Sequence, residues 1–359
     1  MIYSPAEDSE FLAGFVKNIA RGRVLDIGCG SGIQSSTASS KKEVTSVLGV
    51  DIDKESVSYC KKNIVSPKVS FLVSDIFSNV KGTFDTIVCN PPYLPQDEGI
   101  DDIALYGGKQ GQEFAERIIV EAGDYLTEKG QIIILTSSLS NEKQFLETCA
   151  KNLYDSKLLG IKNMGLFETL HAWMITKNIV RKTLEKKKIS AIHFFAKGKR
   201  GFVLKGIYKK KVVAIKVKNP DSFALGSVEN ESRMLKIVNK KSIGPTFLFS
   251  GVGFVVYEFV EGTFLRDVIY SCTKKVKNAI VQQLFKQCKI LDGIGVEKGE
   301  LARPLKNAII AKKGKLVLID FERARMRENP KNTRQVLQFI ARIGMITKET
   351  AIGRGKALK

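Results

Sequence analysis

Apolar residues in the first half of the chain form short runs of strand type, and segments with helical spacing separate them. The runs lie at 23–27, 47–51, 69–73 and 87–89. The first helix is indicated by apolar residues that follow Pro5 and two acids, namely Phe11, Leu12, Phe15, Val16 and Ile19. Strands that alternate with helices predict a doubly wound α/β fold around a parallel sheet.

A polar side chain stands at or directly after the end of each strand. Asp26, Asp51 and Asp75 belong to the first three strands, and Asn90 follows the fourth. The carboxyl ends of neighbouring parallel strands meet at one edge of the sheet. We therefore expect these four side chains to surround one pocket.

The pattern favours a nucleoside as the ligand of this pocket. Gly28 and Gly30 let a ligand approach the backbone of the first turn closely. Asp51 lies about 20 residues further on, where a carboxylate binds ribose hydroxyls, while Asp75 and Ile76 suit an adenine ring. No phosphate-binding charge accompanies these residues, which favours an adenosyl group over a dinucleotide.

The fourth strand runs into Asn90-Pro91-Pro92-Tyr93. Two prolines cannot continue a strand ladder, so the backbone after Asn90 is stiff. The Asn90 side-chain oxygen and the Pro91 carbonyl are hydrogen-bond acceptors, and Tyr93 offers a flat ring. The loop therefore suits a planar group with an NH2, whose lone pair is left facing an electrophile.

These motifs resemble S-adenosylmethionine-dependent methyltransferases with a Rossmann-like fold that act on amino or amide nitrogens. More specifically, they resemble the archaeal and eukaryotic branch of the HemK/PrmC-type glutamine N5-methyltransferases. The opening Tyr3-x-Pro5-Ala6-Glu7-Asp8-Ser9 matches the Tyr-x-Pro-Ala-Glu-Asp-Thr of that branch. Residues 104–111 and 166–170 resemble its Gly-Gly-x-x-Gly and Phe-Glu-x-Leu segments, and the resemblance covers residues 1 to about 177.

By position, the resemblance implies two groups of site residues. The residues expected to contact S-adenosylmethionine are Ser9, Asp26, Gly28, Gly30, Asp51, Asp75, Ile76 and Asn90. The residues expected to be catalytic, by holding the substrate amide, are Asn90, Pro91, Pro92 and Tyr93. Ser9 replaces the usual Thr, and Leu105 and Tyr106 depart from the usual aromatic and small pair. No general base is expected, and His171 is interpreted as structural.

The resemblance also implies a substrate and a partner. The substrate is the glutamine in the Gly-Gly-Gln loop of a class 1 peptide release factor, and the partner is a small zinc-ribbon activator subunit. Adenine N6 in RNA or DNA is an alternative acceptor, because the same loop suits that amine. The family-specific opening motif favours the protein acceptor.

The second half resembles a protein-kinase-like fold of the small archaeal type, akin to the RIO and telomere-complex-associated kinases. Val213-Ala214-Ile215-Lys216, a helix-period segment from Glu231 and Leu316-Val317-Leu318-Ile319-Asp320-Phe321-Glu322 carry the resemblance. It implies ATP and Mg²⁺ as ligands, with Lys216 on phosphate oxygens, Glu231 holding Lys216 and Asp320 holding the metal.

Other features of this half depart from active kinases. Ala196 replaces the first loop glycine, Glu322 replaces a glycine, and Asn307 lies seven residues after the acid, Glu300, at the base position. An inactive kinase fold that serves as a basic docking module is therefore an alternative. A kinase whose methyltransferase half is a scaffold is another.

Charge is unevenly distributed along the 359 residues, whose net charge is +21. Residues 1–177 carry 18 Lys and Arg against 23 Asp and Glu, whereas the remainder carries 40 against 14. We predict a methyltransferase domain at 1–177, a charged linker at 178–188 and a basic kinase-like domain at 189–359. A solvated connector is the default interpretation of the linker, with a helix as an alternative. The basic half suits contact with RNA, the ribosome or an acidic partner. A generally lysine-rich proteome is an equal explanation, because no RNA-binding aromatic motif is found.

Six cysteines lie far apart without a Cys-x-x-Cys pair, which is typical of reduced thiols in a cytosolic protein without a zinc site. No signal peptide and no apolar run of membrane length is found, so a cytoplasmic location without membrane contact is expected.

Overall fold

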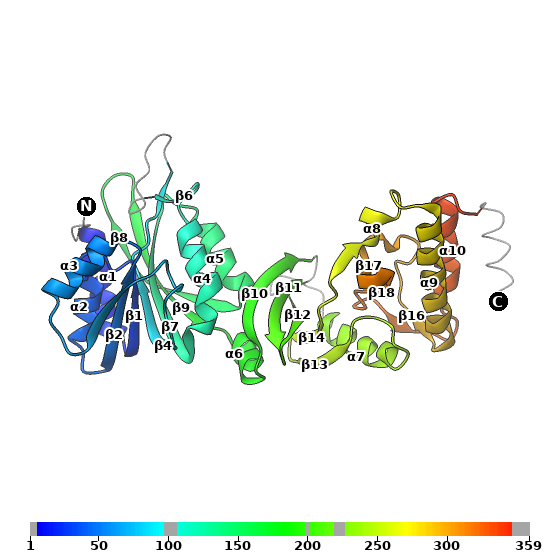
Figure 1. The fold of residues 1–359 in the computed structure, drawn as a ribbon, viewed down its shortest axis with the longest axis horizontal. Coiled ribbons are helices and arrows are strands. Elements are labelled where there is room, and N and C mark those ends of the chain that lie inside the picture. Colours follow the sequence, from blue (N-terminus) through cyan, green and yellow to red (C-terminus); the bar gives the residue numbers. More distant parts are fainter. Residues whose placement is uncertain (1–5, 97–105, 199–200, 219–226, 347–359) are drawn as a thin grey trace. The chain divides into compact units, whose positions relative to one another are not determined.

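The computed structural model describes residues 6–96, 106–198, 201–218 and 227–346. The chain divides into two compact units, Met1–Phe194 and Phe195–Lys359, which are considered separately (Figure 1). Several residues that carry the sequence resemblances lie outside the described residues, namely Tyr3, Pro5, Ala104 and Leu105.

The first unit is built on a mixed sheet with the strand order β3-β2-β1-β4-β7-β9-β8. Its strands are β1 (Gly22–Ile27), β2 (Val44–Asp51), β3 (Val69–Val73), β4 (Phe84–Cys89), β7 (Leu126–Ser137), β8 (Tyr154–Asn163) and β9 (Thr169–Lys177). Strands β3, β2, β1, β4 and β7 are parallel, whereas β9 is antiparallel to both of its neighbours. The order reverses at β1 and β4, which is where open α/β sheets bind ligands.

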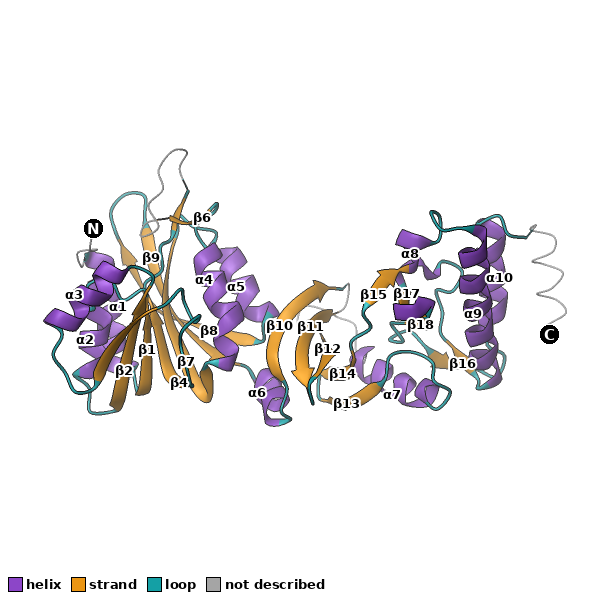
Figure 2. Cartoon of the chain, in the orientation of Figure 1, coloured by secondary structure: helices purple, strands orange, loops and turns teal. Residues whose placement is uncertain are grey.

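Helices cover both faces of this sheet, with α1, α2 and α3 on one face and α4 and α5 on the other (Figure 2). Their bounds are α1 (Glu7–Ile19), α2 (Ile33–Ser39), α3 (Lys54–Asn63), α4 (Glu113–Glu121) and α5 (Glu142–Lys151). A parallel sheet that is buried on both faces needs nearly continuous apolar strands, which explains the sequence pattern. The predicted Rossmann-like α/β fold of the N-terminal half is confirmed.

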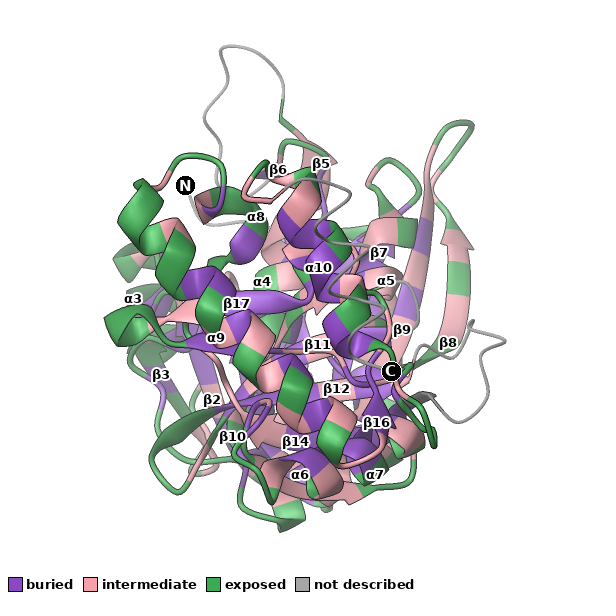
Figure 3. Ribbon diagram, turned by 90° about the vertical axis from the view of Figure 1, so that its right-hand side faces the viewer, coloured by how far each residue is buried: buried purple, intermediate pink, exposed green. Residues whose placement is uncertain are grey.

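The hairpin between β8 and β9 lies at the same edge of the sheet as the carboxyl ends of β4 and β7, because Cys89 is level with Ile134 and Ser137 is level with Leu170. Leu166 at the tip is 93 % exposed and Phe167 is 86 % exposed. Strand β8 is the outermost strand of the sheet, next to β9, and Figure 3 shows it mostly exposed or half-buried.

The segment 178–188 contains a helix, α6 (Ile179–Lys186), and this helix is packed within the first unit instead of being solvated throughout. The Arg181 side chain is buried, and its guanidinium donates to the carbonyls of Asn152, at 2.7 Å, and Ile192, at 3.2 Å. Lys177 is buried beside it and donates to Glu185 at 2.7 Å. These cations are charge-paired and hydrogen-bonded, so a charge run that looked solvated is tolerated in the interior.

A second sheet has the strand order β10-β11-β12-β14-β13. Strand β10 begins before the boundary at Phe194, whereas β11, β12, β14 and β13 belong to the second unit and pair antiparallel, with α7 packed on them. These elements are β10 (Ser190–Lys197), β11 (Gly201–Tyr208), β12 (Lys211–Lys218), α7 (Ser227–Asn239), β13 (Phe247–Gly251) and β14 (Phe254–Glu258).

The rest of the second unit is mainly helical, and α9 packs against α10. Its main elements are β15 (Gly262–Phe264), α8 (Leu265–Val268), α9 (Lys274–Gly293), β16 (Val296–Glu297), β17 (Ala308–Ala311), β18 (Leu316–Leu318), β19 (Arg325–Met326) and α10 (Asn332–Arg342). Among the described helices of either unit, none has the length and apolar character needed to span a membrane.

Candidate functional site

The predicted site residues of the first unit gather at one edge of the sheet. Ile27 on β1 is level with Val50 on β2 and Cys89 on β4, and Asp51 is level with Val73 on β3. The residues that follow these strands are therefore neighbours, which brings the glycine turn, Asp51, the Ser74–Ile76 segment and Asn90 together as predicted.

The turn after β1 is shaped for a close backbone approach. Gly28 and Gly30 have φ values of 70° and 50°, in the left-handed region that favours glycine. A Cβ added at Gly28 would meet no atom within 4 Å, so the space beside it is open. Asp51 fixes the turn, because its Oδ2 accepts from the Gly30 N–H at 2.9 Å.

Asp26 is buried beneath this turn, with 1 % of its surface exposed. Burial raises the pKa of its carboxyl to about 6, and the hydrogen bond from Ser35 Oγ at 2.7 Å only partly opposes that rise. A buried acid with a raised pKa is a candidate for a functional residue. Asp26 lies two residues before Gly28, at the end of β1.

Asp75 and Ile76 follow β3 but differ in their surroundings. The Asp75 side chain is half-exposed and pairs with Arg117 at 3.2 Å. The Ile76 side chain packs in the apolar core, and its φ of 45° is a strained value for a β-branched residue. Such strain is concentrated at ligand sites, whereas the Ile76 side chain itself lies in the core and its carbonyl accepts from Ser74 Oγ at 3.1 Å.

The Asn90 carboxamide is hydrogen-bonded through its nitrogen, whereas its oxygen has no partner among the described residues. Its Nδ2 donates to Asp8 Oδ2 at 2.8 Å and lies 3.5 Å from Ser9 Oγ. Its Oδ1 is buried and has no hydrogen-bond partner in the described part of the chain. An unpaired buried acceptor costs about 1–3 kcal/mol, and a hydrogen-bond donor from a ligand would offset this cost.

The backbone of Pro92 and Tyr93 packs closely against the glycines of the 106–111 segment. A Cβ at Gly107 would lie 2.3 Å from the Pro92 carbonyl oxygen, and one at Gly111 would lie 2.3 Å from the Tyr93 carbonyl oxygen. No side chain fits at either position without a shift of the backbone. The Gly-Gly-x-x-Gly segment therefore holds the loop after Asn90 in place.

Comparison with known proteins places this site in a family. The methyltransferase small domain profile matches residues 6–157. A putative protein N5-glutamine methyltransferase of Methanocaldococcus jannaschii is 43 % identical over 150 residues, which are 40 % of this chain and 76 % of that protein. The chain belongs to the family of this methyltransferase. Its first unit is a methyltransferase unit with S-adenosylmethionine as its cofactor.

Other relatives match over shorter stretches. A release factor glutamine methyltransferase of Buchnera aphidicola is 34 % identical over 146 residues, which are 36 % of this chain and 53 % of that protein. The chain thus spans about half the length of this bacterial relative. The solved Mtq2–Trm112 complex of E. cuniculi, described as responsible for methylation of the termination factor eRF1, has a TM-score of 0.40 and 23 % identity, covering 49 % of this chain and 98 % of that one.

Asp8 is the residue of the methyltransferase unit that sequence reasoning missed. The helix dipole favours any acid in a first turn, so an acid at this position needs no further explanation. The contact with Asn90 spans 82 positions of sequence. The local pattern therefore held no signal for this contact, although Asp8 belongs to the opening motif that carries the family resemblance. His171, interpreted as structural, lies 2.5 Å from Glu142 through its Nδ1 and packs edge-on against Trp173.

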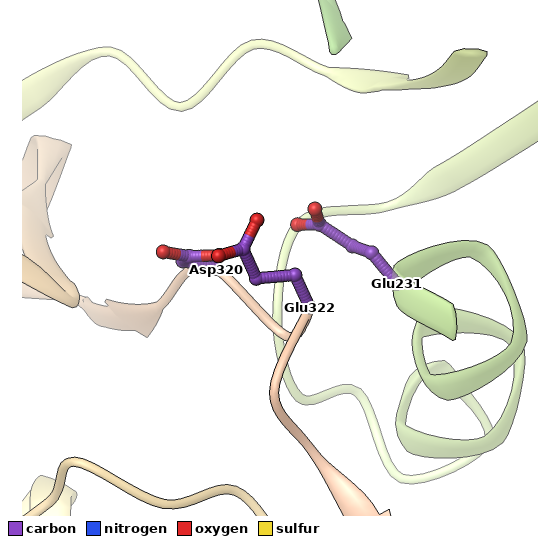
Figure 4. Close-up of side chains that lie close together, drawn as sticks. All are labelled: Glu231, Asp320 and Glu322. Carbon is purple, nitrogen blue, oxygen red and sulfur yellow. The ribbon is translucent and has the colours of Figure 1, made fainter. Parts of the chain in front are cut away.

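In the second unit, Lys216 of β12 is the centre of an acidic cluster. Its Nζ lies 2.6 Å from Glu231 of α7, 2.9 Å from Asp320 and 3.1 Å from Glu322. Figure 4 shows the three carboxylates, which have oxygens within 4.8 Å of one another. Burial opposes the charge on Lys216, but the carboxylates outweigh it and raise the pKa of this amine. Glu322 was noted in the sequence only as a departure from Gly, yet it contributes the third carboxylate.

Glu300, the expected catalytic-loop acid, is engaged by other side chains. Asn307 Nδ2 donates to it at 2.8 Å, and Arg323 pairs with it. Lys298, two residues earlier, is buried and donates to the Asp320 carbonyl at 3.1 Å. The structure thus brings Lys216, Glu231 and Asp320 together as expected, and it links the Glu300 segment to them through Lys298.

Proposed function

We propose that the methyltransferase unit methylates the side-chain amide nitrogen of a glutamine in a protein, and that this protein is a class 1 peptide release factor with a Gly-Gly-Gln loop. The unpartnered Asn90 Oδ1 carries the proposal, because it is a buried acceptor that awaits an N–H donor. The identity to an archaeal protein named as a glutamine methyltransferase supports the choice of amide. The name of the bacterial relative supports the choice of release factor.

Residues of this chain fit the cofactor. The open space at Gly28, the buried acid Asp26 and the strand-end carboxylate of Asp51 would hold it. S-adenosylmethionine supplies an electrophilic methyl group when it is bound. Asn90 Oδ1 and the Pro91 carbonyl would accept the two amide hydrogens, and Tyr93 would stack on the amide plane.

The chemistry that these residues perform is positioning. An amide nitrogen is a poor nucleophile because its lone pair is conjugated with the carbonyl. Holding the amide in line with the methyl donor contributes up to about 7–11 kcal/mol to lowering the barrier. The clamped backbone after Asn90 provides this rigidity. The proton leaves the nitrogen after transfer, so no general base is required.

The test is methyl transfer from labelled S-adenosylmethionine by the purified chain. The acceptors are an archaeal class 1 release factor, the same factor with Gly-Gly-Gln changed to Gly-Gly-Ala, and total RNA. Each reaction is run with and without a zinc-ribbon activator subunit. Label on the release factor that is lost in the Gly-Gly-Ala variant is the expected result. Label confined to RNA would replace the proposal with adenine N6 methylation.

We propose for the second unit a protein-kinase-like fold that binds ATP and Mg²⁺. The observation that carries this proposal is the ion pair of buried Glu231 on α7 with Lys216 on β12, next to Asp320. Carboxylates of Asp320 and Glu322 would hold the metal, and Lys216 would pair with phosphate oxygens.

The test is the thermal stability of the chain with ATP and Mg²⁺. Stabilisation is expected for the wild type and for Lys218→Met, on the same strand, and is expected to be lost in Lys216→Met. Stabilisation without phosphoryl transfer to the chain, the release factor or casein would favour the inactive docking module. The absence of stabilisation in the wild type would contradict nucleotide binding.

A further inference from the structure

We infer that Asp8 is a positioning residue for methyl transfer, because its carboxylate fixes which end of the Asn90 carboxamide faces the acceptor nitrogen. The inference rests on the proposed function only for its kinetic consequence. The orientation of Asn90 can be tested without any acceptor.

The contact joins two elements that are distant in sequence. Asp8 lies in the first turn of α1 with 4 % of its surface exposed, and Asn90 follows β4. Asn90 Nδ2 donates to Asp8 Oδ2 at 2.8 Å. An ionised carboxylate has only acceptors, so it can pair only with the NH2 end of a carboxamide. Asn90 Oδ1 is thereby turned away from Asp8, and it is the buried acceptor without a partner in the described residues.

Asp8 is itself held in place. Its Oδ1 accepts from the Ser9 backbone N–H at 2.6 Å, at a helix N-terminus where anions are favoured. The Ser9 carbonyl in turn accepts from Gln34 Nε2 on α2 at 2.8 Å. The carboxylate therefore meets Asn90 from a fixed direction, and the start of α1 is tied to α2.

The fixed orientation of Asn90 makes the site selective for substrates whose reacting nitrogen is a hydrogen-bond donor. The two ends of a carboxamide are nearly equal in shape, so packing alone does not distinguish them. If the Asn90 amide rotated by a half-turn, its NH2 would face the NH2 of the acceptor, and two donors would oppose each other. Asp8 excludes this rotamer because its carboxylate cannot donate to Asn90 Oδ1. It thereby selects acceptors that carry an NH2.

Glu7 provides a matched control for the alternative that Asp8 is merely a favourable acid at a helix start. Glu7 lies in the same first turn, but its side chain is 69 % exposed and pairs with Lys162 at 3.1 Å on the surface. Loss of a helix-dipole interaction would affect Glu7→Gln and Asp8→Ala alike. Loss of Asn90 orientation would affect Asp8→Ala alone.

The first experiment observes Asn90 directly in the full chain. With 15N-asparagine labelling, the Asn90 side-chain NH2 signals are assigned by their disappearance in Asn90→Ala. A hydrogen bond to a carboxylate is expected to shift them and slow their exchange with water in the wild type and in Glu7→Gln. In Asp8→Ala both effects are expected to be lost. Unchanged Asn90 signals in Asp8→Ala would overturn the inference, whatever the substrate of the enzyme.

The second experiment measures kinetics with the release factor as acceptor. Asp8→Ala is expected to lower kcat by about 10- to 100-fold, with the cofactor Kd changed by less than about threefold. Equal loss of cofactor affinity and kcat would assign Asp8 to cofactor binding instead. No methylation of release factor by the wild type, together with the expected NMR result, would reject the proposed substrate and leave the positioning role intact.

A reciprocal exchange gives the sharpest test. Asn90→Asp alone places two carboxylates face to face and is expected to abolish detectable transfer. In the double variant Asp8→Asn with Asn90→Asp, the amide at position 8 donates to one carboxylate oxygen at position 90, and the other oxygen faces the acceptor. Recovery of at least about tenfold over Asn90→Asp is expected. An equally inactive double variant, in which the new amide at position 8 shows no hydrogen-bonded NH2 signal, would contradict the inference.

Discussion

At the residue scale, burial of the Asp26 carboxylate lowers the stability of the folded chain at neutral pH. Its pKa is about 6 in the folded chain against an ordinary value of 3.8, because burial disfavours the charged form. The folded state therefore binds the proton more tightly than the unfolded state does. Stability attributable to Asp26 is complete below about pH 4, falls as the pH rises to about 6, and is lower by up to about 3 kcal/mol above that.

We therefore predict that Asp26→Asn stabilises the cofactor-free chain at pH 7.5 and has little effect at pH 4. Urea unfolding of both proteins across this pH range measures the difference. The same variant is expected to lose cofactor affinity, since the neutral amide no longer offers a carboxylate. A variant less stable than the wild type at pH 7.5 would show that Asp26 is compensated in the free protein.

Substitutions of Asn90 and of Asp51 are predicted to impair different steps, methyl transfer and cofactor binding respectively. Asn90→Ala should abolish transfer yet retain cofactor binding within about threefold, because it removes the acceptor for the substrate amide. Asp51→Ala should weaken cofactor binding by at least about tenfold, because it also releases the Gly30 N–H. Calorimetric titration with S-adenosylhomocysteine separates the two outcomes. Equal losses of affinity would mean that the roles of the two positions are wrongly assigned.

Residues at strand ends could be placed from the sequence because strand periodicity and parallel pairing determine where they lie. Asp26, Asp51 and Asn90 are such cases, and the structure puts them at one edge. The Asp8–Asn90 bond could not be predicted, since it depends on how α1 packs on the sheet. The core position of the Ile76 side chain depends on packing in the same way.

At the scale of elements, α6 shows where sequence patterns mislead. The sequence pattern predicts that the Lys and Arg residues from Arg181 onward are exposed to solvent, and most of them are not buried. Arg181 and Leu184 nevertheless share one buried face of the helix. A buried Arg is recognisable only when its partners are known, and here they are carbonyls from distant segments and Glu185.

The close approach of Gly123 to Arg181 leads to a prediction for α6. A Cβ at Gly123 would lie 1.6 Å from the Arg181 guanidinium, which its hydrogen bonds hold in place. Gly123→Ala is expected to cost about 3 kcal/mol by displacing a buried charge from its partners. Gly14→Ala at an exposed position of α1, where a Cβ meets nothing within 4 Å, should instead add about 0.5–1 kcal/mol. Chemical denaturation of both variants tests this contrast, and equal effects would contradict it.

At the scale of the whole molecule, the packing of α6 sets the limit of the methyltransferase unit. A chain of residues 1–194 should fold and bind S-adenosylmethionine. A chain of residues 1–177, the predicted domain, should be unstable because Lys177 loses Glu185 and the Arg181 anchor is removed. Circular dichroism melting with and without cofactor distinguishes them. Equal melting temperatures would show that α6 contributes little.

The two units differ strongly in charge, because residues 1–194 carry 23 Lys and Arg against 24 Asp and Glu and are nearly neutral. Residues 195–359 carry 35 Lys and Arg against 13 Asp and Glu, so this part accounts for the whole positive excess of the chain. We predict that the full chain binds RNA whereas residues 1–194 do not. The affinity should fall by about 10³-fold between about 50 and 200 mM salt if about six phosphates are neutralised. Fluorescence anisotropy with a labelled RNA measures this slope, and a flat salt response would exclude the phosphate contacts.

The hairpin between β8 and β9 is separate in sequence from the predicted cofactor residues. The predicted cofactor residues follow the parallel strands β1 to β4 or begin α1, whereas the hairpin with exposed Leu166 and Phe167 extends from β8 and β9 at the same edge. Ser137 secures the base of this hairpin through Glu168 at 2.8 Å. Because the hairpin carries none of the predicted cofactor residues, a change in its length or sequence would leave those residues in place.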